Sequence, residues 1–263
     1  MKISVIGAGA MGGAIVEGLL KTDETNAADI TASDPSEQAL SRFSQTGISL
    51  TTDNSSAAAN ADIVMVVVKP WLVESVIESI KPSLNLDRQI IIVIAAGVSS
   101  SDIKKWLNKG DNVKPRLFLA IPNTAIAVKE SMTFLVPVDA DDKDTAAVKQ
   151  LFSLLGGCIV TEERLLAAGT TLASCGIAYA MRYVRAAVEG GVEIGFKAKD
   201  AESIVLQTVK GAVSLLQATG EHPESAIDKV TTPGGVTIRG LNEMEHAGFT
   251  SAVIRGIKAG LGK

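Results

Sequence analysis

The sequence predicts an α/β protein, with a doubly wound sheet in its N-terminal half and an all-helical C-terminal half. Three observations predict this fold. Short apolar segments alternate with helical segments up to Thr161. The run 62–68 is almost continuously apolar, as expected of a parallel strand that is covered on both faces. β-branched runs then stop, and 163–263 shows one helical pattern after another. We therefore expect two domains, 1–161 and 162–263.

The first element combines a strand, a glycine-rich turn and a helix. Met1–Ile6 is a short apolar strand, and apolar residues recur at helical spacing from Ala14 to Leu20. Between them lies a Gly-x-Gly-x-x-Gly motif, which in this context predicts a Rossmann-type dinucleotide-binding domain. Its glycines permit a tight turn, close approach of a pyrophosphate and close helix packing; the motif is Gly7-Ala8-Gly9-Ala10-Met11-Gly12. The alternative is a tight turn that binds no ligand.

The following elements continue the alternation up to Thr161. Regular βαβ units place ligands beyond the carboxyl ends of the strands. We predict strands at 30–33, 62–68, 90–95, 116–120, 133–136 and 158–160, and helices at 36–43, 71–80, 99–107 and 143–155.

The second half is predicted to consist of helices at 177–196, 200–218, 234–247 and 250–261. Asp200 favours a helix start and Gly248 a helix end. Ala187, Gly190, Gly191 and Gly195 form a face of small residues, although glycine destabilises a helix interior. We therefore predict a homo-oligomer in which another helix packs closely here; close packing within one subunit is the alternative.

Composition limits the remaining classes of function. The chain has 263 residues and a net charge of −4, and it has no basic block, which argues against nucleic acid as a partner. No apolar run reaches the ~18 residues of a membrane span. Because the N-terminus is already a strand, we expect no signal peptide and a cytoplasmic location. Cys158 and Cys175 lack metal-type spacing, so we expect reduced thiols and no metal.

Asp34 ends the second predicted strand and bears on the cofactor. An acid at this place hydrogen-bonds the adenosine ribose hydroxyls, and it would repel a 2′-phosphate. Charge alone therefore favours NADH over NADPH, although Ser33 and Ser36 can donate to a phosphate and NADPH stays open. The alternative is that Asp34 only caps the following helix.

A second glycine-rich turn stands before the helix at 234–247. Pro233 fixes the helix entry, and Gly234 and Gly235 free the backbone to turn. Unpaired N–H groups at a positive helix end can bind a carboxylate without Arg or Lys. The alternative is an ordinary capped helix start.

Together these motifs resemble the Δ1-pyrroline-5-carboxylate reductase family along almost the whole chain. Thr232-Pro233-Gly234-Gly235-Val236-Thr237 is the most specific of them, and the motif at 6–12 is shared by many dehydrogenases. The other matching segments are Val68-Lys69-Pro70, Ala95-Ala96-Gly97-Val98, Pro122-Asn123-Thr124 and Ala178-Tyr179-Ala180.

The resemblance implies NAD(P)H-dependent reduction of L-1-pyrroline-5-carboxylate to L-proline, the final step of proline biosynthesis. Alternatives are a reductase of related cyclic imines (piperideine carboxylates) and a nicotinamide-binding regulator without turnover. In the family the helical domains of two subunits interlock, and rings of dimers also occur. Hydride goes to the C=N carbon of a protonated imine, so the protein's main task is orientation.

The resemblance also implies roles for individual residues. Ile6, Gly7, Ala8, Gly9, Ala10, Met11 and Gly12 would hold the pyrophosphate, Ser33 and Asp34 the ribose, and Asn54 the adenine. Val67, Val68, Lys69, Pro70, Ile94, Ala95 and Ala96 would border the nicotinamide half, with Lys229 near the cofactor from the helical side. Thr232, Gly234, Gly235, Val236 and Thr237 would bind the substrate, and Thr237 would also act in catalysis.

The chain departs from the family pattern at three places. Residues 173–177 read Ala-Ser-Cys-Gly-Ile where the family has Ser-Gly-Ser-Gly-Pro. Ala125 replaces a proline, and Asp34 replaces the small or basic residue that is common in NADPH users. These differences bear on the substrate loop and on cofactor preference.

A β-hydroxyacid dehydrogenase would need a lysine base on the first long helix of the second domain. That activity is disfavoured, because 177–196 contains no lysine.

Overall fold

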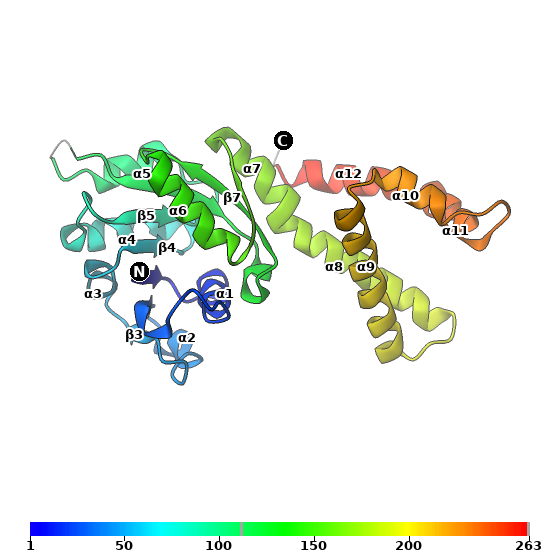
Figure 1. Cartoon of the computed structure of the whole chain (residues 1–263), viewed down its shortest axis with the longest axis horizontal. Coiled ribbons are helices and arrows are strands. Elements are labelled where there is room, and N and C mark those ends of the chain that lie inside the picture. The colour runs from blue at the N-terminus through cyan, green and yellow to red at the C-terminus, as the bar shows by residue number, and fades with distance from the viewer. Residues whose placement is uncertain (111–112, 262–263) are drawn as a thin grey trace. The chain divides into compact units, whose positions relative to one another are not determined.

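The computed structural model describes residues 1–110 and 113–261, and the chain divides into two compact units, Met1–Cys175 and Gly176–Lys263 (Figure 1). The boundary at 161/162 that we inferred from the sequence stays a prediction. Each unit is described by itself.

One sheet forms the centre of the first unit. Among the described residues it has eight strands in the order β3-β2-β1-β4-β5-β6-β7-β8. The strands are β1 (Ile3–Ile6), β2 (Ile30–Ser33), β3 (Ser49–Thr51), β4 (Ile63–Val66), β5 (Ile90–Val93), β6 (Arg116–Ile121), β7 (Ser131–Pro137) and β8 (Gly156–Val160). The predicted doubly wound α/β fold is confirmed, and β1 and β4 pair side by side at its centre.

Two details of the sheet differ from the prediction. β7 runs antiparallel to β6, because only the short 3₁₀ segment Thr124–Val128 joins them and a parallel return needs a longer crossover. β3 was missed, since its three residues are too short for a period to be recognised.

The helices of this unit are α1 (Ala10–Leu19), α2 (Glu37–Ser41), α3 (Asn54–Ala59), α4 (Val73–Ile80), α5 (Ser100–Leu107), α6 (Asp142–Ser153) and α7 (Leu166–Gly169), with a π-helical segment at Thr170–Ser174. Ser99 caps α5 as predicted, its side chain accepting from the N–H of Asp102. The helix predicted to end near Phe43 is present as α2, which Ser36 caps, and it ends at Ser41; α3, rich in small residues, was missed.

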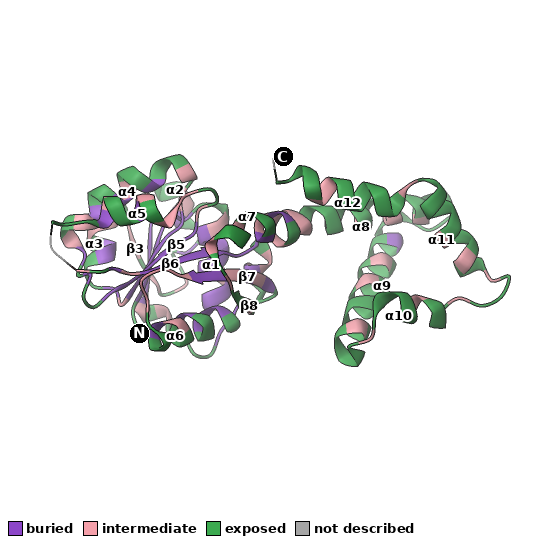
Figure 2. Ribbon diagram, turned by 90° about the horizontal axis from the view of Figure 1, so that it is seen from above, coloured by how far each residue is buried: buried purple, intermediate pink, exposed green. Residues whose placement is uncertain are grey.

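The sheet separates two hydrophobic clusters, because alternate residues of each strand point to opposite faces. Met65 packs on one face with α1 and α6 residues such as Ile15 and Phe152. Val64 packs on the other with Ile77 of α4 and Ile103 of α5. Buried residues therefore concentrate in and around the sheet (Figure 2).

Three further contacts lie within this unit. The guanidinium of Arg116 pairs with the carboxylate of Asp144, which is 5% exposed. The carboxylate of Asp62 accepts the backbone N–H of Lys2 at 2.9 Å. On β8, the half-buried thiol of Cys158 packs against the cluster that contains Met65.

The second unit contains helices joined by short turns. They are α8 (Cys175–Glu193), α9 (Ala198–Thr219), α10 (Pro223–Lys229), α11 (Val236–His246) and α12 (Phe249–Ala259). The first residue of α8, Cys175, is the last residue of the first unit. The all-helical prediction is confirmed, as are Asp200 in the first turn of α9 and a left-handed Gly248 between α11 and α12. α10 was missed, although Pro223 in its first turn is a typical start signal.

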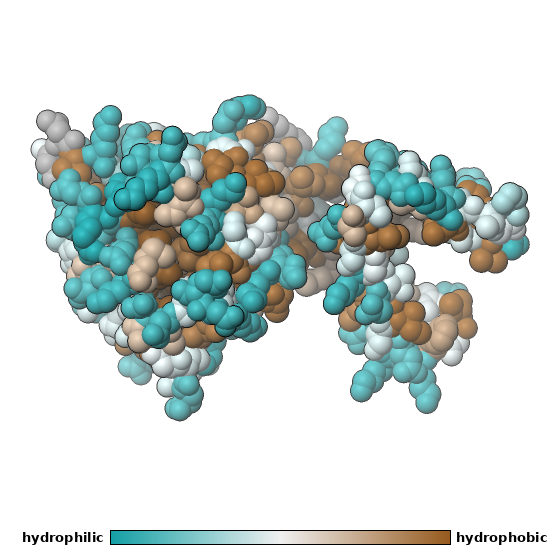
Figure 3. Space-filling view, viewed as in Figure 1, coloured by the Kyte–Doolittle hydropathy of each residue, from teal (hydrophilic) through white to brown (hydrophobic). Residues whose placement is uncertain are grey.

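Most apolar side chains of this unit are exposed. Of residues 176–261 only Ala201 is buried. Hydrophobic residues accordingly gather on the surface of the helices (Figure 3). Across the part of the chain that the structure describes, no helix combines the length and the hydrophobicity needed to span a bilayer.

The predicted face of small residues on α8 is only partly right. A Cβ on Gly191 would lie 3.0 Å from Cβ of Ala201, so this glycine permits close packing against α9 of the same chain. Gly195 lies beyond the end of α8 and has a φ of +110°. It therefore belongs to the turn that ends the helix and is not part of a helix face. Gly190 has no atom within 4 Å of such a Cβ.

Candidate functional site

The glycine-rich loop connects β1 to α1 and is held by backbone geometry. Gly7 has a φ of +99°, which favours glycine, and its N–H donates to the carbonyl of Ser33 at 2.7 Å. A Cβ on Gly12 would overlap the carbonyl oxygen of Gly7, so the helix can lie this close only with glycine there. A Cβ on Gly9 would meet no atom within 4 Å. Gly9 therefore leaves open space at the N-terminus of α1.

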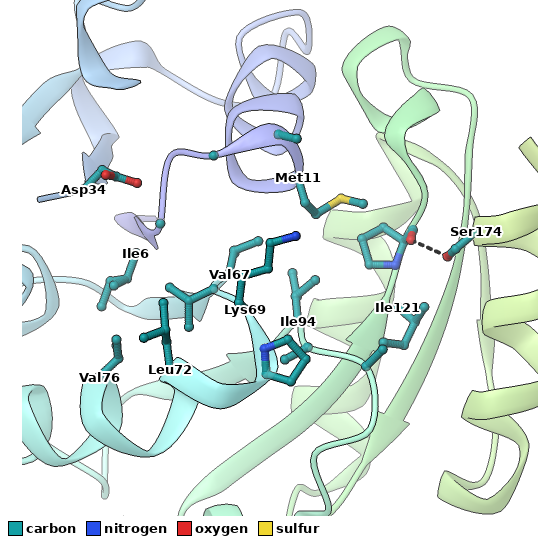
Figure 4. A pocket seen from close by; sticks show the side chains of 18 of the residues that line it. Ile6, Met11, Asp34, Val67, Lys69, Leu72, Val76, Ile94, Ile121 and Ser174 are labelled. Atoms are coloured by element: carbon teal, nitrogen blue, oxygen red, sulfur yellow. Dashed lines mark hydrogen bonds between the residues drawn. The ribbon is translucent and has the colours of Figure 1, made fainter. Parts of the chain in front are cut away.

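That space is part of a cavity of about 670 Å³ in the first unit (Figure 4). Fourteen of the predicted cofactor residues line it: Ile6, Gly7, Gly9, Ala10, Met11, Asp34, Asn54, Val67, Val68, Lys69, Pro70, Ile94, Ala95 and Ala96. Ala8, Gly12 and Ser33 are not in its wall. The cavity lies at the carboxyl ends of the central strands, where a doubly wound sheet binds its ligand.

Polar groups stand at both ends of this mostly apolar cavity. Figure 4 shows Asp34 at one end and Ser174 at the other, with the amino group of Lys69 pointing toward Met11. The hydroxyl of Ser174 donates to the carbonyl of Pro122 at 2.8 Å. Ser174 ends the π-helical segment, a form that is frequent at functional sites. The sequence indicated no role for Ser174 beyond its departure from the family pattern.

Asp34 is tied to the glycine-rich loop. Its Oδ2 accepts the N–H of Ala8 at 2.8 Å, and its Oδ1 accepts the N–H of Ser36 at 2.9 Å. The residue that caps α2 is Ser36, whose hydroxyl oxygen accepts the N–H of Ala39. The alternative that Asp34 is merely the helix cap is therefore wrong.

Arg42 contacts the same loop, which the sequence did not reveal. Its Nη2 donates to the carbonyl oxygens of Ala8 at 2.7 Å and of Gly9 at 2.9 Å. Nη1 lies 3.6 Å from the carboxylate of Glu17, and the guanidinium stacks 4.7 Å above the ring of Phe43. A Cβ at position 13 would overlap this guanidinium, so Gly13, just after the motif, was the available signal.

Asn54 and Ser33 form a linked pair beside Asp34. The hydroxyl of Ser33, at the end of β2, donates to Oδ1 of Asn54 at 2.6 Å. Asn54 is the first residue of α3 and lines the cavity, whereas Ser33 is buried. Ser33 thus orients Asn54 instead of facing the cavity itself.

The second glycine-rich turn belongs to the helical unit. Gly234 has a φ of +69°, and the N–H of Gly235 donates to the carbonyl of Thr232 at 2.9 Å. Gly235 begins α11 without a side-chain cap, so the first N–H groups of the helix lack intrahelical acceptors. Val236 is 77% exposed, and Thr237 follows it in the first turn. The substrate role of these residues stays a prediction.

Lys229 has a partner within its own unit. Its amino group lies 2.7 Å from the carboxylate of Glu221.

A second cavity of about 560 Å³ in this unit is lined by α8, α11 and α12. It is largely apolar, with Tyr183 and Phe249 in edge-to-face contact at a centroid distance of 6.5 Å. The described residues contain no group of three or more His, Cys, Asp or Glu placed to hold a metal ion.

Comparisons with known proteins cover both units. Residues 163–263 match a family model described as pyrroline-5-carboxylate reductase dimerisation, and residues 2–97 match one described as NADP oxidoreductase coenzyme F420-dependent. Pyrroline-5-carboxylate reductase 2 of Dictyostelium discoideum is 35% identical over 97% of this chain and 89% of its own length.

Two further relatives extend this comparison. Pyrroline-5-carboxylate reductase 1 of Dictyostelium discoideum is 40% identical over 97% of this chain, which spans about half (48%) of that relative's length. A solved structure of a pyrroline-5-carboxylate reductase from Coxiella burnetii superimposes with a TM-score of 0.87 at 28% identity, covering 99% of this chain and 96% of that one.

Proposed function

Because this chain belongs to the pyrroline-5-carboxylate reductase family, we propose that it reduces L-1-pyrroline-5-carboxylate to L-proline with NAD(P)H, as the last step of proline biosynthesis. The observation that carries the proposal is the cavity at the glycine-rich loop, which combines open space at Gly9 with the uncapped N-terminus of α1. A pyrophosphate fits such a place, because the free N–H groups and the helix dipole attract negative charge.

The cavity walls support an extended dinucleotide. Asp34 and Asn54 would hold the adenosine end, and the loop from Gly7 to Gly12 would hold the pyrophosphate. The segments that directly follow β4 and β5, 67–70 and 94–96, would border the nicotinamide, and their apolar side chains would exclude water from it. The bound cofactor supplies a hydride to the substrate carbon.

The helical unit would hold the substrate acid. The uncapped N–H groups at the start of α11 suit a carboxylate, and the Thr237 hydroxyl would bond the ring nitrogen or a carboxylate oxygen. A protonated imine is already electrophilic, so no strong general acid is needed. Orientation by these donors is the protein's contribution to the rate. The family resemblance also supports a place for Lys229 near the cofactor from the helical side.

We further propose that domain 162–263 forms a homodimer, with rings of dimers as a larger form. The dimerisation model matched at 163–263 and the exposed apolar faces of α8, α9 and α12 support this. The proposed substrate is a small cyclic imino acid. We also propose that the protein is cytoplasmic and binds neither nucleic acid nor membranes.

One assay tests the proposed activity. Oxidation of NADH and of NADPH is followed at 340 nm (the absorbance of the reduced nicotinamide) with pyrroline-5-carboxylate, and with piperideine carboxylates as competing substrates. We expect turnover with the five-membered imine and weaker turnover with the six-membered rings. Cofactor binding without oxidation would instead indicate a regulator, and preference for the six-membered ring would indicate a related imine reductase.

A further inference from the structure

The histidine at the start of α10 has a task that the sequence did not reveal. Nδ1 of His222 accepts the backbone N–H of Glu224 at 3.3 Å, so the imidazole caps the helix. A cap satisfies one of the N–H groups that a helix start leaves without an intrahelical acceptor. The imidazole can do this only while Nδ1 carries no proton, because both nitrogens of an imidazolium are donors.

The helix α10 depends on local contacts of this kind. It has only seven residues, and none of them is buried. Helices this short are marginal unless caps or packing hold them. A second local contact joins Lys229, the last residue of α10, to Glu221, which directly precedes His222; Nζ and Oε1 lie 2.7 Å apart. The cap and this ion pair therefore hold the two ends of the helix.

The last turn of α10 leads directly into the second glycine-rich turn. The hydroxyl of Thr231 donates to the carbonyl of Asp228 at 2.9 Å, and its backbone N–H donates to the same oxygen at 3.2 Å. The next residue, Thr232, accepts the N–H of Gly235 through its carbonyl, so no free residue stands between the helix and the turn. The position of the turn before α11 therefore follows from the position of α10.

The charges near His222 belong to its own segment. They are the carboxylates of Glu221 and Glu224 and the amino group of Lys229, which pairs with Glu221. Among the described residues no charged group of another helix bonds to this imidazole. Histidine is the side chain that ordinarily changes charge between about pH 5 and pH 8. A proton on Nδ1 would remove the acceptor and place a positive charge at the positive end of the helix dipole.

We propose that neutral His222 is a positioning residue of the proposed reaction: it caps α10 and thereby holds the second glycine-rich turn in the form that binds the substrate. Protonation of His222 loosens this turn, so the substrate binds less tightly in mild acid. The proposal rests on the proposed function for the identity of the substrate, whereas the capping of α10 does not depend on it.

Three forms of the full-length protein separate the cap from the charge: wild type, His222→Ala and His222→Asn. Asn caps a helix well and does not titrate, whereas Ala cannot cap. At about pH 7.5 we expect His222→Ala to raise the KM for pyrroline-5-carboxylate about three- to fivefold, the factor by which a lost cap shifts a helix equilibrium. His222→Asn should stay within about 1.5-fold of wild type. The kcat and the affinity for NADH should change little in both.

The pH dependence distinguishes a titrating cap from a merely structural residue. At about pH 6 the KM of wild type should exceed that of His222→Asn at least about twofold, although the two agree at about pH 7.5. Comparing the two proteins at the same pH cancels the titration of the imine substrate itself.

Amide hydrogen exchange tests the cap without turnover. Peptides that cover 222–229, followed by mass spectrometry, should exchange faster in His222→Ala than in wild type at about pH 7.5. At about pH 6 wild type should exchange nearly as fast as His222→Ala measured at that pH, and His222→Asn should stay slower.

The other histidine of the chain provides the matched control. His246→Asn, at the last residue of α11, should reproduce wild type at both pH values. A wild-type KM in His222→Ala, or the same rise toward acid in wild type and His222→Asn, would overturn the proposal. If His222→Ala does not fold, the comparison of wild type with His222→Asn still decides it. Absence of turnover in every form would overturn the proposed function, and hydrogen exchange would then decide the role of the cap.

Discussion

The two units use their apolar residues in opposite ways. In the first, strands such as β4 and β5 are buried over their whole length between helices on both faces of the sheet. In the second, Ala201 alone is buried among residues 176–261, and side chains such as Leu206 and Phe249 are exposed. Helices in proteins gain most of their stability from packing an apolar face against other elements. The first unit therefore carries its own core, whereas the helices need a partner surface.

The largest effect should come from the core of the first unit. Phe118 on β6 is fully buried, and Phe118→Ala should lower the free energy of unfolding by about 3–5 kcal/mol through lost contacts and a cavity. Urea denaturation at several protein concentrations measures it, and the loss should not depend on concentration. Val128→Ala, at a side chain that is 60% exposed, is the control. A loss under 1 kcal/mol would mean that this core is not what stabilises the unit.

The helical unit should respond through association instead. Leu206 on α9 is 51% exposed, and Leu206→Glu should weaken the proposed homodimer about 10-fold or more, because a buried charge is costly at an interface. Analytical ultracentrifugation gives the dissociation constant. Gln207→Glu adds the same charge at the neighbouring exposed position and should change it little. Equal dimerisation in both variants would argue that this face of α9 is not in the interface.

A smaller effect is expected at the second glycine-rich turn. Thr237→Ala should lower kcat/KM by about 10-fold, or about 1.4 kcal/mol of transition-state stabilisation. The affinity for NADH should stay unchanged, because the dinucleotide cavity is built entirely from the first unit. Steady-state kinetics and titration measure the two quantities. Thr208→Ala on α9 is the matched control, and unchanged kcat/KM in Thr237→Ala would remove the residue from the mechanism.

The smallest effect concerns acid stability of the first unit. The backbone N–H of Lys2, opposed by partial burial and supported by Arg88, holds the pKa of Asp62 below its ordinary value. A carboxyl whose pKa is lowered by folding stabilises the protein above its unfolded-state pKa and loses that contribution as pH falls through the lowered pKa.

Asp62→Asn should therefore show a flatter decline of the urea midpoint between pH 5 and pH 3 than wild type. Asp23→Asn, at an exposed turn, controls for the loss of one carboxylate. Identical slopes in wild type and Asp62→Asn would show that the contact with Lys2 adds nothing to stability.

The difference in burial between elements also explains which of them could be predicted from the sequence. Periodicity found the long buried strands and helices, because burial on both faces leaves an apolar run such as 62–68. It missed β3 and α3, whose few small or half-exposed residues leave no period. The strand β7 was predicted, but its antiparallel direction was not, because the signal for direction lies in the short connection and not in the strand itself.

For the site, the motif residues could be placed but the contacts between them could not. The Gly-x-Gly-x-x-Gly pattern located the loop, and fourteen predicted residues line one cavity. Arg42 escaped notice, since its partners are backbone carbonyls 33 and 34 positions away, and such contacts leave no pattern in a sequence. Ser174 escaped for the same reason, because its acceptor is the carbonyl of Pro122.

The half-buried sulfur on β8 has a chemical consequence. Burial raises the pKa of Cys158 to about 11, with a small opposing effect of Lys149. At neutral pH only about one molecule in ten thousand then carries the thiolate, which is the form that attacks peroxides and alkylating reagents. This position should therefore react more slowly with peroxides and with maleimide dyes than an exposed cysteine of ordinary pKa.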